Sequence, residues 1–296
     1  MFPIFEQTSP GRKLLLLVLA ILAGQLVGSI IAAIPAIIIG PSSPWTLRIA
    51  VAIGSLCSFV LPGAVLAHLY SSTPWSYLGL RRTYSHNFAA AGFIMLGVLP
   101  GINLLMSIND LPQLPAWMIE MEELMERQLE LMLSSNGIAG YIVNVLVISI
   151  MAAFGEEFVF RGLMQRHLTR LTRSQIGGII ITALIFSAIH FQFKGFLARF
   201  ALGAVLGFLY ATTNSLWVPI FAHALNNFMS ISAYTVLGKG SDMDTLGSLD
   251  NLWPLGVASL AVVVFMLSKL RSAPAPADDA KGHGGSEGDG SSLLAE

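Results

Sequence analysis

Long apolar runs dominate the pattern of hydrophobic and polar positions along the chain. Eight of them approach or reach the roughly 17 to 25 residues that an α-helix needs to cross the hydrocarbon core of a bilayer. The predicted spans are residues 14–39, 47–70, 88–106, 138–163, 176–191, 196–211, 217–236 and 252–267. Prolines inside several of these runs, among them Pro35, Pro62 and Pro100, are compatible with helices, because neighbouring helices can satisfy the backbone groups that proline leaves free. The pattern predicts an all-α, polytopic membrane bundle of about eight transmembrane helices.

A shorter periodic segment lies between the third and the fourth predicted spans. Its positions recur at three- and four-residue steps after Pro115, which predicts an amphipathic helix with this proline at its first position. The recurring residues are Trp117, Met118, Met121, Leu124, Met125, Gln128, Leu129 and Met132. Such a helix either packs against the bundle or the membrane interface, or it gates the access of a substrate.

Loop charges indicate how the spans are oriented. If the N-terminus lies inside, the inner segments hold Arg12, Lys13, Arg81, Arg82, Arg166, Arg170, Arg173, Lys269 and Arg271. The outer segments then hold about one basic residue each, together with Glu120, Glu122, Glu123, Glu126 and Glu130. Because cytoplasmic loops carry an excess of lysine and arginine, this distribution predicts an even number of spans with both termini cytoplasmic.

The composition agrees with a membrane protein. Of 296 residues, 54% are hydrophobic and 11% are charged, whereas a soluble domain carries about 25% charged residues. The net charge of −1, without a basic stripe interleaved with aromatic residues, gives no reason to expect nucleic acid as a partner. The single cysteine, Cys57, excludes an intrachain disulfide. We therefore expect an integral, multi-pass protein of the plasma membrane, or of the inner membrane in a bacterium.

The two ends of the chain differ in character. The apolar stretch after Arg12 and Lys13 is too long for the apolar region of a signal peptide, so we interpret it as a retained first span. Residues 272–296 are rich in Ala, Pro, Asp, Gly and Ser, and are too polar to bury a core. We expect one membrane domain over residues 1–271, with its motifs at about residues 138–236, and a disordered cytoplasmic tail over residues 272–296.

Three charged residues stand inside the fourth predicted span. Glu156, Glu157 and Arg161 lie in an otherwise apolar run, where each charge costs about 2.5 to 3.5 kcal/mol at the centre of a membrane helix. Arg161 follows Glu157 by four residues, so a helix places the two on one face as an internal ion pair. Glu156 points about 100° away from that face and lacks this partner. Glu156 is therefore the candidate for chemistry.

Two later spans contain histidines. Phe186 and His190 are four residues apart, as are His223 and Asn227, so each pair shares one helix face. Ionisable groups within a membrane are costly and usually face the bundle interior, where they serve a function. Taken singly, His190 is typical of a hydrogen-bonded packing histidine, and Asn227 of a helix-to-helix hydrogen bond.

Helix geometry predicts which of these residues can meet. If the fourth helix reverses near Arg173, Glu156 and His190 each lie 17 residues from that turn. At 1.5 Å per residue both are about 25 Å from the turn, on antiparallel neighbours, and could touch. His223 lies only about 12 Å beyond the next turn, near Ser215, so we expect it to need a helix tilt, a kink at Pro219 or a shorter sixth span to join them.

Together these residues form three motifs: Glu-Glu-x-x-x-Arg, then Phe-x-x-x-His, then His-x-x-x-Asn, from Glu156 to Asn227. In order and spacing they resemble the CPBP family of intramembrane proteases, which includes the CAAX prenyl endopeptidase Rce1 and bacterial Abi proteins. The resemblance covers about a quarter of the chain. It implies an intramembrane endopeptidase that acts on membrane-associated protein or peptide substrates.

The resemblance also implies roles for individual residues. Glu156 would be the general base that activates a water, and His190 would hold and polarise that water. His223 and Asn227 would donate hydrogen bonds to the oxyanion. The implied catalytic residues are thus Glu156, His190, His223 and Asn227. Apart from the resemblance, we interpret Glu157 and Arg161 as a charge-compensating pair that orients Glu156, and we assign Phe186 to the same structural or orienting group. An apolar pocket disfavours the charged form of a carboxylate, which suits a base that works near neutral pH.

Metal use stays open at this point. Glu156, His190 and His223 are a plausible ligand set for zinc or another divalent metal, because catalytic zinc usually takes three protein ligands and a water. However, the chain contains no His-Glu-x-x-His signature. We favour a metal-free water bound by glutamate and histidine, and expect no cofactor.

Two other classes of function compete with a protease. One is a non-catalytic scaffold or a bacteriocin immunity or processing factor, which should tolerate the loss of Glu156 as long as the helices pack. The other is a proton-coupled carrier that uses Glu156 and the histidines as a relay. Carriers usually show paired inverted repeats with broken helices, and the sequence shows no such symmetry.

Overall fold

The computed structural model describes residues 3–110, 113–133, 137–238 and 245–270. Within these residues the secondary structure is helical, without a strand, and the predicted all-α class is confirmed. The α-helices are α1 (Pro10–Ile39), α2 (Pro44–Ser55), α3 (Leu61–Tyr70), α4 (Pro74–Leu78), α5 (Ser85–Gly97), α6 (Leu99–Asn109), α7 (Ala116–Leu133), α8 (Gly137–Asn144), α9 (Ala152–Glu157), α10 (Arg166–Thr172), α11 (Gln175–Ala188), α12 (Phe196–Thr213), α13 (Trp217–Leu237) and α15 (Trp253–Lys269). Three π-helical segments complete the list: η1 (Leu56–Val60), η2 (Val145–Met151) and η3 (Phe158–Gln165).

Each of the eight predicted spans overlaps one of these helices or a series of them, but the fifth, residues 176–191, extends past the end of α11 at Ala188. The described stretches that are long and apolar enough to cross a membrane are Pro10–Ile39, Pro44–Tyr70, Gly137–Thr172 and Phe196–Thr213. Helices α5 and α6 form a fifth candidate, which bends by 43° between Gly97 and Leu99. Helices α11 and α15 are apolar but shorter. The membrane bundle is thus confirmed, and the number of eight crossings stays a prediction.

The packing leaves large apolar surfaces facing outward. In α1 the buried residues are Lys13, Leu17 and Gly28, while Ile37 and Ile38 are 83% and 77% exposed. A helix that is apolar on its outer face is stable when lipid surrounds it. One buried core surrounds η3 and is shared with α1, α3, α4 and α11, and a second core joins α5, α12, α13 and α15.

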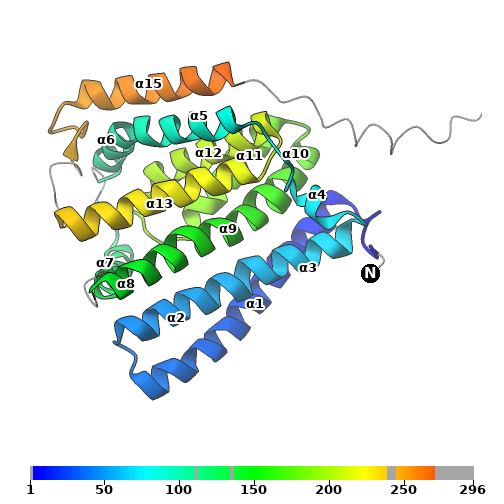
Figure 1. Ribbon diagram of the computed structural model, residues 1–296, viewed down its shortest axis with the longest axis horizontal. Coiled ribbons are helices and arrows are strands. Elements are labelled where there is room, and N and C mark those ends of the chain that lie inside the picture. The colour runs from blue at the N-terminus through cyan, green and yellow to red at the C-terminus, as the bar shows by residue number, and fades with distance from the viewer. Residues whose placement is uncertain (1–2, 111–112, 134–136, 239–244, 271–296) are drawn as a thin grey trace, which may run out of the picture.

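The two ends of the described chain lie toward the same end of the bundle but at opposite edges of it (Figure 1). Helix α1 begins and α15 ends at the same end of the bundle, with α1–α3 along one edge and α15 along the opposite edge (Figure 1). An even number of crossings requires this arrangement. The predicted cytoplasmic side of both termini stays a prediction, and the predicted tail over residues 272–296 lies outside the described residues.

The predicted amphipathic helix is present as α7, but it starts one residue later than expected. The Pro115 carbonyl accepts hydrogen bonds from the backbone of Met118 and Ile119, so Pro115 precedes the helix rather than opening it. Met132 is the buried residue of α7. The helix therefore lies on the surface of the bundle.

The glutamate motif lies on one continuous helical stretch, Gly137–Thr172, as predicted for the fourth span. This stretch ends at Arg173, which adopts a left-handed backbone conformation (φ 52°) at the predicted point of reversal. The π-helical segments η2 and η3 flank α9, which carries Glu156 and Glu157. Such segments leave the regular i→i+4 ladder and are frequent at functional sites, because they redirect side chains and backbone groups.

Candidate active site

A fully buried ion pair anchors the site. The Arg161 Nη1 atom donates to Glu157 Oε1 at 2.7 Å, and both side chains are 0% exposed. The other terminal nitrogen of Arg161 donates to the Gly203 carbonyl at 2.9 Å, and the guanidinium lies 4.9 Å from the centre of the Phe186 ring. The predicted internal pair is confirmed. It links the helical stretch Gly137–Thr172, called the glutamate helix below, to α11 and α12.

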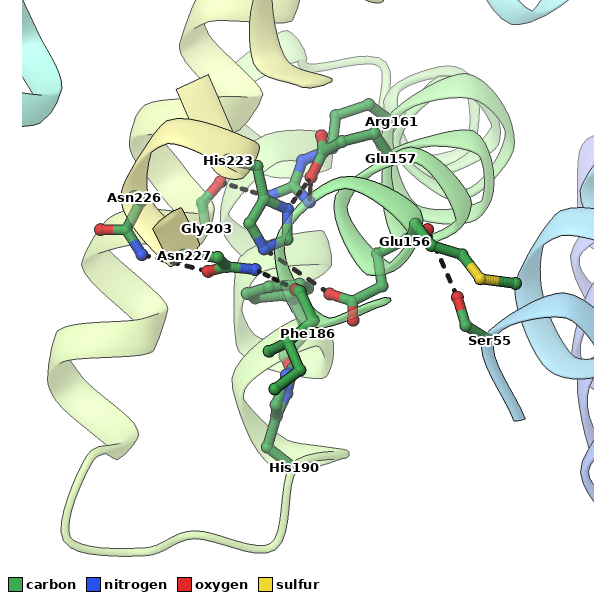
Figure 2. A network of polar contacts seen from close by, with 12 residues as sticks. Ser55, Glu156, Glu157, Arg161, Phe186, His190, Gly203, His223, Asn226 and Asn227 are labelled. Carbon is green, nitrogen blue, oxygen red and sulfur yellow. Dashed lines mark hydrogen bonds and ion pairs between the residues drawn. The ribbon is translucent and has the colours of Figure 1, made fainter. Parts of the chain in front are cut away.

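His223 connects the two glutamates. Its Nδ1 atom is 2.8 Å from Glu157 Oε1, and its Nε2 atom is 3.8 Å from Glu156 Oε2 (Figure 2). An ionised carboxylate can only accept, so Nδ1 carries the hydrogen and donates to Glu157. The predicted pair of Glu157 with Arg161 therefore contacts His223 directly, and it is positioned to orient this ring.

His223 reaches the glutamates although counting from the turn near Ser215 had placed it at a different level. Helix α13 packs along both η2 and α9. Because the packing of these helices determines which residues meet, the distance along a straight helix from the preceding turn was a poor guide. The difference in level that we expected from straight helices therefore does not keep His223 from the glutamates.

Each of the two glutamates has a buried Oε2 atom without a hydrogen-bond partner among the described residues, and Glu156 is the one that is partly exposed. Its side chain is 14% exposed. Buried polar atoms are nearly always hydrogen-bonded, so an exception of this kind points to a bound water or to a catalytic role. In Figure 2 this carboxylate points toward the side where His223 and Asn227 lie.

His190 lies just beyond the end of α11, half-buried. The rings of Phe160 and Phe186 are in contact at 5.1 Å. Phe160 follows Glu156 by four residues and Phe186 precedes His190 by four, so on antiparallel helices His190 lies at the level of Glu156. No hydrogen bond or ion pair joins the two side chains in the described part of the chain, so the structure supports the predicted level but shows no direct contact.

The ring of His190 has a defined tautomer. Its Nδ1 atom is 2.7 Å from the Phe186 carbonyl, which can only accept, so Nδ1 carries the hydrogen. In the neutral ring Nε2 is therefore the acceptor. An acceptor nitrogen can receive a hydrogen bond from a water molecule.

The side chain of Asn227 contacts the backbone of the glutamate helix. Asn227 Nδ2 donates to the Ile148 carbonyl at 3.1 Å, and Asn227 Oδ1 accepts from Asn226 Nδ2 at 3.3 Å. Ser149 Oγ donates to the Ala224 carbonyl at 2.6 Å. Ile148 and Ser149 belong to η2, and these two bonds fasten α13 to that segment.

Several of these contacts were not predicted. The serine inside an apolar run was a detectable signal for Ser149. The carbonyls of Ile148 and Gly203 carry no sequence signal, because every residue has a carbonyl group and only the packed structure determines which one is used.

Glu156, His190 and His223, the residues considered as zinc ligands, are not arranged as a metal site. Within the described ranges, no group of three or more His, Cys, Asp or Glu side chains is placed so that it could hold a metal ion.

Comparison with known proteins is informative for this part of the chain. The family described as "Type II CAAX prenyl endopeptidase Rce1-like" matches residues 138–229. This segment of the chain, called the Rce1-like segment below, is similar to that family. It contains all seven residues of the three motifs, so the resemblance predicted from them is confirmed.

Two curated proteins of Bacillus subtilis (strain 168) are similar to the chain. "Putative membrane peptidase YdiL" is 37% identical over 83 residues, and "Uncharacterized protein YpbD" is 33% identical over 86 residues. Each match spans 28% of this chain, and it spans 34% of YdiL and 41% of YpbD. No solved structure matches the chain. With its apolar helices and Rce1-like segment, the chain is an integral, multi-pass membrane protein.

Proposed function

We propose that this protein is a membrane peptidase that hydrolyses peptide bonds of membrane-associated proteins or peptides with a water activated by Glu156. The observation that carries the proposal is the partly exposed carboxylate of Glu156, which lies within the Rce1-like segment, has no hydrogen-bond partner at Oε2 among the described residues, and approaches His223 Nε2 at 3.8 Å. The similarity to a protein named as a membrane peptidase supports the same class of reaction.

In the proposed reaction a water lies between Glu156 Oε2 and the acceptor nitrogen Nε2 of His190. The water oxygen attacks the carbonyl carbon of the substrate while its proton passes to Glu156. The carbonyl oxygen becomes an oxyanion, and collapse of the tetrahedral intermediate breaks the C–N bond. Glu156 returns its proton to the leaving amine, so the products are a carboxyl group and an amine.

The oxyanion would be stabilised by His223 and Asn227. An amide nitrogen carries two hydrogens, and Asn227 uses one of them for the Ile148 carbonyl, which leaves the other for the oxyanion. For His223 to donate through Nε2, its ring must carry hydrogens on both nitrogens. The Glu157 carboxylate at Nδ1 stabilises that charged form. Removal of one fixed donor of this kind typically costs about 3 to 4 kcal/mol of barrier.

With His223 protonated, the charges of the site would sum to zero. Glu156 and Glu157 contribute two negative charges, and Arg161 and protonated His223 contribute two positive charges. A neutral sum matters because an uncompensated charge in a low-dielectric interior is costly. Glu157 with Arg161 is therefore assigned to orienting and charging His223, and Glu156 is left free to act on water.

The proposal is tested with purified protein in liposomes that also contain a bacterial membrane-protein fraction. New protein N-termini are identified by mass spectrometry for the wild type, for Glu156→Gln and for the control Glu123→Gln, whose side chain is 57% exposed on α7. We expect the same set of new N-termini with the wild type and the control, and none of them with Glu156→Gln. Equal yields from Glu156→Gln would contradict a peptidase and favour a scaffold.

A further inference from the structure

The loop that follows His190 is held in an unfavourable conformation. Residues 189–195 connect α11 to α12, with His190 in the first turn. Phe191 has φ 52°, a left-handed conformation that a bulky residue rarely adopts and that costs of order 1–3 kcal/mol. Such a conformation persists only when surrounding contacts impose it.

A carboxylate from α7 supplies one of these contacts. Glu122 Oε2 accepts hydrogen bonds from the backbone N–H groups of Phe193 at 2.6 Å and of Lys194 at 3.2 Å. Both donors lie just before the start of α12, where a negative charge is favourable because of the helix dipole. Charge-assisted bonds of this kind are stronger than neutral ones. Whereas Glu120 and Glu123 are exposed, Glu122 is half-buried against the loop.

A second anchor comes from the end of α6. Asn109 donates through Nδ2 to the Phe193 carbonyl and accepts through Oδ1 from the backbone N–H of Leu197 at 3.1 Å. The Trp117 ring of α7 meets the Phe193 ring edge-on at 5.5 Å. Phe193 is thus held by its N–H, its carbonyl and its ring.

The anchored residues are close in sequence to His190. Phe193 follows it by three residues, and Ser187, three residues before it, donates through Oγ to the Phe196 carbonyl at 2.7 Å. The ends of α11 and α12 are therefore fastened together on both sides of His190. A shift of the loop must move the backbone from which the His190 ring extends.

We propose that Glu122 is a positioning residue, which fixes the loop of residues 189–195 and thereby sets the His190 ring opposite Glu156. This inference rests on the proposed peptidase function. Helix α7 lies outside residues 138–229, so the Rce1-like match does not extend to this contact. The amphipathic helix would thus serve the site as a clamp on the His190 loop.

The test compares cleavage rates in liposomes for Glu122→Ala, Glu122→Gln, Asn109→Ala and the control Glu123→Ala. A glutamine oxygen can accept the same two backbone hydrogen bonds, so we expect Glu122→Gln to stay within a few fold of the wild type. Glu122→Ala should fall by about tenfold or more, because small misplacements of a reacting group cost up to about a hundredfold. Asn109→Ala should also fall, and Glu123→Ala should not change.

A further measurement does not depend on cleavage. Hydrogen exchange of the peptide that covers residues 189–197, and the NMR signal of the His190 ring, are compared between the wild type and Glu122→Ala. We expect faster exchange and a shifted ring signal, with an unchanged thermal midpoint. Wild-type exchange and an unshifted ring in Glu122→Ala would overturn the clamp, as would an equal loss of rate in Glu122→Gln. Absence of cleavage by the wild type would instead overturn the proposed function.

Discussion

At the scale of single residues, the site consists of two carboxylates that differ in their partners. Glu157 is 0% exposed and its Oε1 atom accepts hydrogen bonds from both Arg161 and His223, whereas Glu156 is 14% exposed and approaches His223 at 3.8 Å. Adjacent positions on one helix thus receive different roles, because a helix turns each side chain by about 100°. One carboxylate stabilises the site, and the other is available for a substrate water.

Removal of Glu157 tests this division. In Glu157→Ala the guanidinium of Arg161 stays buried without its carboxylate, and breaking a buried pair typically costs about 3–5 kcal/mol of stability. We expect a markedly lower thermal midpoint in detergent. Glu157→Gln keeps an oxygen acceptor for the His223 ring but loses the charge that compensates Arg161, so it should fold and cleave more slowly.

The control is Glu123→Ala, which removes an exposed i,i+4 pair with Arg127 at 3.7 Å. Exposed pairs contribute about 0.2–1 kcal/mol, so this variant should unfold close to the wild type. If Glu157→Ala unfolds at the temperature of the control, the buried pair has no structural role and this interpretation is wrong.

The motifs allowed much of the site to be predicted at this scale. The Glu157–Arg161 pair and the level of His190 relative to Glu156 follow from helix periodicity alone. The contact of His223 with Glu157 could not be predicted, since it depends on how α13 packs. The anchoring of the His190 loop by Glu122 was also not apparent, because its partners are backbone groups.

At the scale of elements, glycines on α12 allow the glutamate helix to pack closely against it. Arg161 and Gln165 donate to the carbonyls of Gly203 and Gly207 at 2.9 and 3.0 Å. A Cβ atom on Gly203 would lie 3.2 Å from Ala183 Cα and from the Phe186 ring. Small residues of this kind let membrane helices approach closely. The glycines thus allow α11, α12 and η3 to meet at the site.

Substitution of Gly203 tests this packing. Gly203→Leu should separate α11 from α12 and lower stability by about 1–3 kcal/mol, which is typical of overpacking. Cleavage should also fall, because Phe186 and His190 would move. Gly54→Leu on α2 is the matched control, since a Cβ atom there meets nothing within 4 Å. Equal thermal midpoints for the two variants would contradict the close approach.

At the scale of the whole molecule, the pattern of apolar runs predicted where helices form, and each predicted span overlaps helical structure. Apolar length alone does not determine how many of these helices cross the membrane. The described α11 has 14 residues and α15 has 17, below the usual length of a span. The distribution of basic residues among the loops predicts which side of the membrane each loop faces. The packing of the helices does not show this orientation.

The predicted orientation can be measured with single cysteines in a Cys57→Ser background. Ser72→Cys lies in the loop between α3 and α4 on the predicted inner side, and Glu123→Cys lies on α7 on the predicted outer side. A membrane-impermeant maleimide added to intact cells should label position 123 but not position 72 until the cells are permeabilised. Labelling of position 72 in intact cells would reverse the orientation.

The central claim is that Glu156 activates the attacking water. The most direct measurement uses Glu156→Gln to trap a bound membrane protein, identifies it by mass spectrometry, and then compares its cleavage by purified wild type and Glu156→Gln in liposomes. Loss of a general base typically costs about 10²- to 10⁴-fold, so we expect a decrease of at least a hundredfold with binding retained. Cleavage by Glu156→Gln at the wild-type rate would contradict this account.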